Sequence, residues 1–133
     1  MTRIESKEVR IERPATELGA FLHDMTNFRQ LLPEGRISEW TASKDECSFK
    51  VQGAATIGLR IAEGSTDQHV KMVATDRSPF PFTLDVRLLE QNGTTSGKLE
   101  FNSDLNPMLR LMVEKPLKNL FDHIADRMAA LHE

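Results

Sequence analysis

Residues 103–128, SDLNPMLRLMVEKPLKNLFDHIADRM, read as one long helix with a proline in its middle. Asn106 followed by Pro107 is typical of a helix start, because the asparagine can accept from a free amide and the proline lacks only an unpaired hydrogen. The predicted helix over 107–131 would span somewhat under ~40 Å, enough to cross a whole sheet. Its apolar residues recur at helical spacing as one broad stripe: Leu109, Met112, Val113, Pro116, Leu117, Leu120, Ile124 and Met128.

Pro116 predicts a bend in this helix, because it cannot donate a hydrogen bond to the carbonyl of Met112 and also crowds it. In a straight helix such a proline would cost about 3 kcal/mol. The cost is tolerable where the helix must follow a strongly curved sheet. Two interpretations stay open: a kink that improves packing, or a kink that shapes a pocket or gate. Met108 and Leu111 lie off the stripe, which fits deeper burial, a cavity mouth or a subunit contact.

The rest of the chain predicts an antiparallel sheet. Residues 3–12 predict a first strand, in which Val9 and Ile11 alternate with Arg10 and Glu12. Two short helices follow, one starting at Pro14 and one capped by Thr26 or Asn27. From about residue 36 the apolar period becomes two, as in ECSFKVQG and TIGLRIAEG, and Asn92-Gly93 signals a hairpin. We therefore expect one α+β domain over 1–133, with a curved antiparallel sheet of about seven strands wrapped around the long kinked C-terminal helix.

Composition excludes several classes of function. The chain has 133 residues and a formal net charge of -3, which argues against a nucleic-acid partner because phosphate binding needs a concentrated basic surface. Its single cysteine, Cys47, allows no internal disulfide and fits a reducing compartment. The charged N-terminal segment shows no signal peptide, and no apolar run is long enough for a transmembrane segment. A cytoplasmic location is the resulting prediction.

The order of these elements resembles the helix-grip fold of the START-like superfamily, also called SRPBCC. The segment VRIERPATELGAFLHDMTNF, residues 9–28, is similar to the opening of that family, and NPMLRLMVEKPLKNLFDHIADRM, residues 106–128, is similar to its terminal grip helix. The group includes pathogenesis-related plant allergens, lipid-transfer START domains and polyketide cyclases. The resemblance implies a central apolar cavity whose contents vary among members, and no catalytic motif of the family matches this sequence.

Chemistry-bearing motifs are absent from the sequence. There is no glycine pattern for nucleotides and no paired-cysteine or HExxH metal motif, so neither a cofactor nor a metal is expected. His123 with Asp126 and Asp122 is better explained by a solvated helix end than by a metal site. The other histidines, His23, His69 and His132, are predicted at the surface. Cys47 shares a strand face with apolar neighbours, which predicts a buried, inert thiol.

The leading hypothesis is a protein that binds an apolar or amphipathic small molecule, such as a lipid or aromatic metabolite, in a central cavity. The predicted lining residues are Leu59, Ile61, Phe82, Leu84, Val86, Phe101, Leu109, Met112, Val113 and Pro116. A second hypothesis is a cyclase- or hydrolase-like enzyme that uses a rim residue such as Glu63 or Arg60. A third is a packed interaction module without a usable cavity, with a homodimer formed through Met108 and Leu111.

Overall fold

The computed structural model of this protein describes residues 2–132 and has the α+β architecture that the sequence predicts. Over this range the chain forms eight strands, two α-helices and one 3-10 helix. In chain order these are β1 (Thr2–Glu5), β2 (Val9–Ile11), α1 (Ala15–Leu22), η1 (Met25–Leu31), β3 (Ile37–Ala42), β4 (Glu46–Val51), β5 (Thr56–Ile61), β6 (His69–Ala74), β7 (Thr83–Gln91), β8 (Thr94–Ser103) and α2 (Pro107–Leu131).

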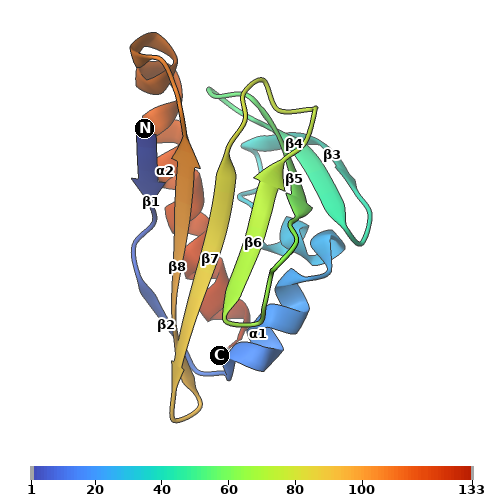
Figure 1. Ribbon diagram of the computed structural model, residues 1–133, viewed down its shortest axis with the longest axis vertical. Coiled ribbons are helices and arrows are strands. Elements are labelled where there is room, and N and C mark those ends of the chain that lie inside the picture. The colour runs from blue at the N-terminus through green and yellow to red at the C-terminus, as the bar shows by residue number, and fades with distance from the viewer. Residues whose placement is uncertain (1, 133) are drawn as a thin grey trace.

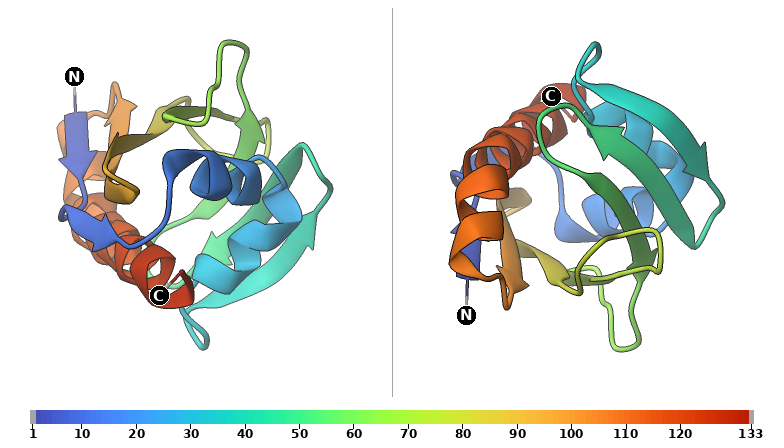
Figure 2. Two further views of the ribbon diagram at one scale, coloured as in Figure 1. Left: turned by 90° about the horizontal axis from the view of Figure 1, so that it is seen from below. Right: turned by 90° about the horizontal axis from the view of Figure 1, so that it is seen from above.

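All eight strands form one antiparallel sheet in the order β1-β8-β7-β6-β5-β4-β3, with β2 also paired to β8. The sheet curls around the interior, α2 runs along its open side, and α1 and η1 lie across the end near the C-terminus (Figures 1 and 2). Because each strand alternates, one row of side chains points into this curl and the other points outward. The curved sheet closed by a long terminal helix is the predicted helix-grip arrangement.

The predicted first strand is divided into β1 and β2, which raises the strand number from about seven to eight. The division occurs at Ser6, where a side chain replaces part of the backbone ladder. The Ser6 amide donates to the Leu99 carbonyl at 2.9 Å, while the Leu99 amide donates to the Ser6 hydroxyl, also at 2.9 Å. In the sequence the alternation changes phase across this break, since Ile4 lies at an even position and the apolar Val9 and Ile11 lie at odd ones; that change is the signal that could have located the break.

The boundaries of the helices largely follow the sequence signals. Asn106 caps α2, since its side chain accepts from the Leu109 amide at 2.8 Å. The predicted cap of the second short helix was wrong: Asp24, rather than Thr26 or Asn27, is its N-cap, and its carboxylate accepts from the Thr26 amide at 3.1 Å and from the Thr26 hydroxyl at 2.6 Å. That segment is a 3-10 helix, the tighter form that is common in short connections.

Two features with positive φ shape the sheet. Asn92 (φ 55°) and Gly93 (φ 81°) join β7 to β8 in the tight hairpin that the sequence predicts. In β3 the register with β4 shifts between Ser38 and Thr41, and Glu39 between them has φ 54°. This irregularity is a β-bulge in the strand at the sheet's outer edge.

Candidate functional site

Aromatic side chains fill the space between the sheet and α2. Phe101 of β8 lies 5.0 Å from Phe82 and 5.6 Å from Phe121 of α2, measured between ring centroids, and Phe80 packs against the same group at 6.4 Å from Phe101. Each of these four rings is at most 7% exposed. The rings therefore form one continuous contact from the sheet to the helix that covers it.

The central cavity inside this core is small and wholly apolar. Its volume is about 10 Å³, close to the ~10–15 Å³ that a single water molecule requires. A ligand in this position would have to displace side chains. The cavity is lined by Phe28, Phe49, Ile57, Leu59, Phe82, Leu84, Phe101, Leu117, Leu120, Phe121 and Ile124.

The predicted lining residues divide into three groups. Four of them line the cavity: Leu59, Phe82, Leu84 and Phe101. Four others lie in or against the core without lining the cavity, two fully buried (Val86, Val113) and two half-buried (Ile61, Leu109). The last two lie elsewhere: Met112 is 61% exposed, and Pro116 lines a separate surface groove.

Met112 is outside the core because the first turns of α2 project beyond the end of β8 (Figure 1). Helical periodicity identifies the face on which Met112 lies but not where the sheet beneath it ends. Seven residues that line the cavity were not predicted: Phe28, Phe49, Ile57, Leu117, Leu120, Phe121 and Ile124. Phe121 follows Leu120 directly and extends the apolar stripe sideways, which is the signal that could have found it.

The groove at Pro116 lies directly outside the cavity. It has a volume of about 280 Å³ and is lined by Pro33, Arg36, Val51, Gln52, Pro116, Asn119, Leu120 and His123. Leu120 lines both the groove and the cavity, so the two hollows adjoin at this side chain. The Gln52 amide donates to the Arg36 carbonyl at 2.9 Å, which holds the β4–β5 turn against the start of β3. The groove is therefore bounded by α2 at Pro116 on one side and by this turn on the other.

His123 connects the groove with a larger open cleft. That cleft has a volume of about 760 Å³ and is lined by Arg29, Gln30, Leu32, Pro33, Glu34, Gly35, Ile37, Ser38, Glu39, Trp40, His123 and Arg127. The pKa of His123 lies below its usual value, first because of partial burial and then because of Arg127, with Arg36 adding to the effect and Asp126 opposing it. His123 is therefore held in its neutral form near neutral pH.

The remaining histidines and the cysteine take structural positions. His69 pairs with Asp85 at 2.8 Å on the outer face, and His23 contacts the Gly19 carbonyl at 2.6 Å. His132 was predicted at the surface, and that was wrong: it is 9% exposed, contacts the Met128 carbonyl at 2.8 Å, and packs against Phe21. Cys47 is buried as predicted, and burial, followed by the charge of Glu46, raises the pKa of its thiol to about 12.

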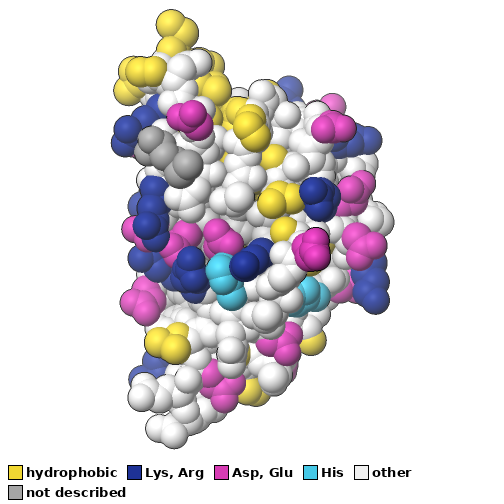
Figure 3. Space-filling model, in the orientation of Figure 1, with side chains coloured by type: hydrophobic (Ala, Val, Ile, Leu, Met, Phe, Trp, Pro, Cys, Tyr) yellow, Lys and Arg dark blue, Asp and Glu magenta, His cyan; other side chains and the backbone are white. Residues whose placement is uncertain are grey.

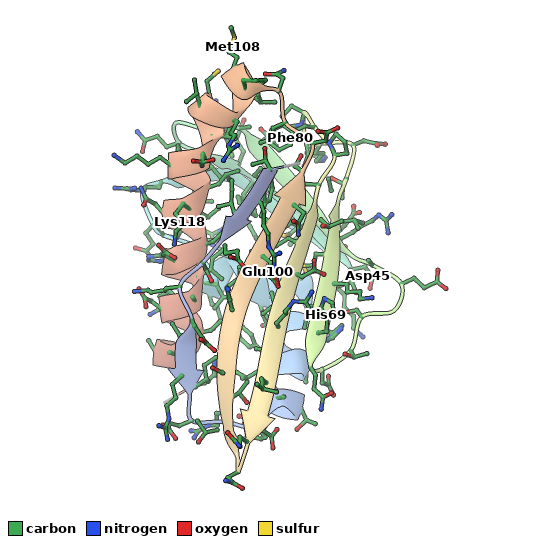
Figure 4. The ribbon with its side chains drawn as sticks, turned by 60° about the vertical axis from the view of Figure 1, so that its left-hand side comes forward. Asp45, His69, Phe80, Glu100, Met108 and Lys118 are labelled. Carbon is green, nitrogen blue, oxygen red and sulfur yellow. The ribbon has the colours of Figure 1, made fainter. Side chains whose placement is uncertain are left out.

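Glu100 is the most buried carboxylate of the outer face, where the sequence predicts only outward-pointing charges. It is 4% exposed and accepts from both Arg3 and Arg87, which lie on the neighbouring strands β1 and β7. Figure 4 shows Glu100 in the middle of this face, with His69 on the same side. Burial acts to raise the pKa of Glu100, but hydrogen bonds from Arg87 and Arg3 outweigh it and lower that pKa below its usual value.

The residues of the enzyme hypothesis do not reach the cavity. Arg60 is exposed on the outer face, opposite Glu46 in the sheet register, and Glu63 is exposed in the loop after β5. Within residues 2–132, no ionisable side chain lines the central cavity, and no group of three or more potential metal ligands occurs. Over the same range no helix has the length and apolar character needed to cross a membrane.

An exposed apolar tip is formed by the first turns of α2. Met108 is 75% exposed, Leu111 84% and Met112 61%. Figure 3 shows hydrophobic side chains gathered where this end of the helix projects from the molecule, and Figure 4 places Met108 at its extremity. We refer to Met108, Leu111 and Met112 as the α2 tip.

Comparisons with known proteins identify the fold alone. No model of a protein family matches the sequence, and no curated protein matches it. Solved structures do match. A START superfamily protein from Mycobacterium smegmatis superimposes with a TM-score of 0.71 at 10% identity, covering 98% of this chain and 96% of that one. XoxI from Bacillus cereus superimposes with a TM-score of 0.72 at 11% identity, covering 99% of this chain and 96% of that one. The Zhui aromatase/cyclase from Streptomyces sp. R1128 superimposes with a TM-score of 0.64 at 13% identity, covering 98% of this chain and 95% of that one.

Proposed function

This chain has the START-like helix-grip fold, and from that premise we propose that it binds an apolar or amphipathic small molecule between the curved sheet and α2. The observation that carries the proposal is the composition of the enclosed space. Only aliphatic and aromatic side chains line it, contributed by η1, by the sheet and by α2. Such a lining favours an apolar ligand through burial of surface and offers no polar group for chemistry.

Binding must be accompanied by opening of the core, because the cavity of about 10 Å³ is smaller than any such ligand. The route we favour passes Leu120, because this side chain lines both the cavity and the adjacent groove. Pro116 lines the same groove and removes a helical hydrogen bond from α2. We infer that the ligand passes between α2 at Pro116 and the β4–β5 turn, and that bending of α2 at Pro116 acts as a gate.

The test is a titration with decan-1-ol, a neutral apolar probe, followed through the methyl signals of selectively labelled isoleucine and methionine. Ile57 and Ile124 line the cavity and should shift on binding, whereas Met108 at the exposed tip should not. Unmoved Ile57 and Ile124 signals across decan-1-ol and a panel of sterols and aromatic hydrocarbons would contradict the proposal.

The α2 tip favours a second candidate function, contact with another copy of this chain. Three large apolar side chains on one exposed helix end are unusual for a surface that meets only water. A homodimer through Met108 and Leu111 would cover them. The measurement of mass that tests this candidate is described in the Discussion.

A further inference from the structure

We propose that the groove at Pro116 binds an anionic head group, so that the ligand is an amphipathic monoanion such as a carboxylate on an apolar chain or ring. The inference rests on the proposed function and narrows it from any apolar molecule to this class. It is argued from the residues that line the groove and from its position beside the cavity.

The groove combines an apolar floor with a rim of hydrogen-bond donors. Pro33, Val51, Pro116 and Leu120 supply the apolar surface. Above it, the polar side chains are Arg36, Gln52, Asn119 and His123. A guanidinium, two amides and an imidazole can all donate hydrogen bonds to an oxyanion, and no carboxylate lines the groove to repel one.

Arg36 supplies a positive charge that the described part of the chain does not neutralise. Its side chain forms no hydrogen bond or ion pair within residues 2–132, although its carbonyl accepts from Gln52. The two carboxylates of α2 that follow Asn119 in the sequence already have partners: Asp122 is bound to Lys118 at 2.9 Å and Asp126 to Lys7 at 2.8 Å. A guanidinium above an apolar groove is therefore available for a bidentate bond to a carboxylate.

The larger cleft beside the groove is less suited to an anion. Its two arginines, Arg29 and Arg127, are matched by Glu34 and Glu39 among the residues that line it. Arg127 also donates to the Gln30 carbonyl at 3.3 Å. Of the two adjacent hollows, only the groove has a cation without a lining carboxylate, so the head group is assigned to the groove.

The position of the groove explains why the ligand should carry an apolar tail. A head group held by Arg36 and His123 would lie next to Leu120, which also lines the apolar cavity. When the Leu120 side chain moves aside, a tail attached to that head group enters the core while the charge stays at the surface. This arrangement avoids the cost of burying an unpaired charge.

The first test compares decanoate with decan-1-ol in Arg36→Gln and in a matched control, Arg60→Gln, whose arginine is exposed on the outer face of β5. Arg36→Gln should weaken decanoate binding about 10-fold, the loss expected for one charge-assisted hydrogen bond, and leave decan-1-ol binding unchanged. Arg60→Gln should change neither.

The second test follows the imidazole signals of His123 through a pH titration with and without decanoate. A bound carboxylate beside the ring favours the imidazolium, so the pKa of His123 should rise on binding. Decan-1-ol should leave it unchanged. A His123 pKa that falls or stays constant at saturating decanoate overturns the head-group assignment.

The outcomes separate the two proposals. If decanoate and decan-1-ol bind equally well to both variants and to the natural chain, with shifts at Ile57 and Ile124, the core binds ligands and the head-group inference fails. If neither probe moves Ile57 or Ile124, the proposed function fails and the inference fails with it.

Discussion

Phe101 and Glu100 are neighbours on β8, and they show how differently the two faces of the sheet are buried. Phe101 points into the curl and is 1% exposed; Glu100 points outward and is 4% exposed. Phe101 contacts Phe80, Phe82 and Phe121, so its burial comes from packing beneath α2. Glu100 is covered by the side chains of Arg3 and Arg87 on the neighbouring strands.

Near-complete burial therefore arises in two different ways in this fold, and the two ways contribute unequally to stability. The inner face loses water because a helix covers it, and its stability comes from apolar area and close contacts. On the outer face a carboxylate loses water because Arg3 and Arg87 fold over it, and both arginines stay more than half exposed. The inner face should therefore dominate the free energy of unfolding.

Phe101→Ala should have the largest effect, a loss of about 3–5 kcal/mol in the free energy of unfolding, because it empties the centre of the aromatic cluster. Urea denaturation followed by circular dichroism measures this loss. Leu89→Ala, at a side chain that is 74% exposed, is the control and should change stability by less than about 0.5 kcal/mol. If Phe101→Ala lowered the free energy of unfolding by less than about 1 kcal/mol, the conclusion that the inner face dominates stability would be contradicted.

Glu100→Gln should cost less, about 1–2 kcal/mol at pH 7, because it removes charge-assisted hydrogen bonds from partly exposed arginines. The folded-state pKa of Glu100 is lowered, so the stability it contributes is complete above the pKa of the unfolded carboxyl. That stability is lost as pH falls through the lower folded-state pKa. The difference in the free energy of unfolding between the natural chain and Glu100→Gln should therefore become smaller in acid. A difference that grows below pH ~4 would contradict the stabilising role of the Glu100 carboxylate.

Pro116→Ala should raise stability by about 1 kcal/mol, because the restored amide can donate to the Met112 carbonyl. If the kink acts as a gate, the same variant should bind decan-1-ol more slowly at similar affinity. Stopped-flow mixing measures that rate. A destabilised Pro116→Ala would indicate that the bend is required for packing over the curved sheet.

Leu111→Asp should change stability by less than about 0.5 kcal/mol, since this side chain is 84% exposed. The homodimer candidate predicts that the natural chain has twice the 15.1 kDa mass of one copy and that Leu111→Asp returns it to one copy. Light scattering after gel filtration measures both. A natural chain with the mass of a single copy eliminates the candidate.

Cys47 should show no reaction with a disulfide reagent while the chain is folded, because the thiol is buried and its pKa is about 12. Modification should appear in step with unfolding in urea, when the thiol becomes accessible and its pKa returns to the ordinary range. Rapid labelling under native conditions would show that β4 opens locally.

The sequence predicts the fold well because the informative signals are local. Asn106-Pro107 sets the start of α2, Asn92-Gly93 sets a hairpin, and alternation assigns strand faces. Residue-by-residue burial is harder to predict because it depends on distant partners. Nothing near Glu100 in the sequence shows that Arg3 will cover it, and nothing near Met112 shows where the sheet ends. The cavity volume depends on how all the lining rings pack together, which no periodicity records.

The bulge in β3 has a consequence for association between copies of the chain. β3 is an outer strand of the sheet, and a regular strand there would offer unpaired amides and carbonyls to an edge of another molecule. The shift between Ser38 and Thr41, with Glu39 at φ 54°, interrupts that ladder and places a charge within it. A bulge and a charge on an edge strand both disfavour pairing with a strand of another molecule, so we expect a straightened β3 to make the protein more prone to aggregation.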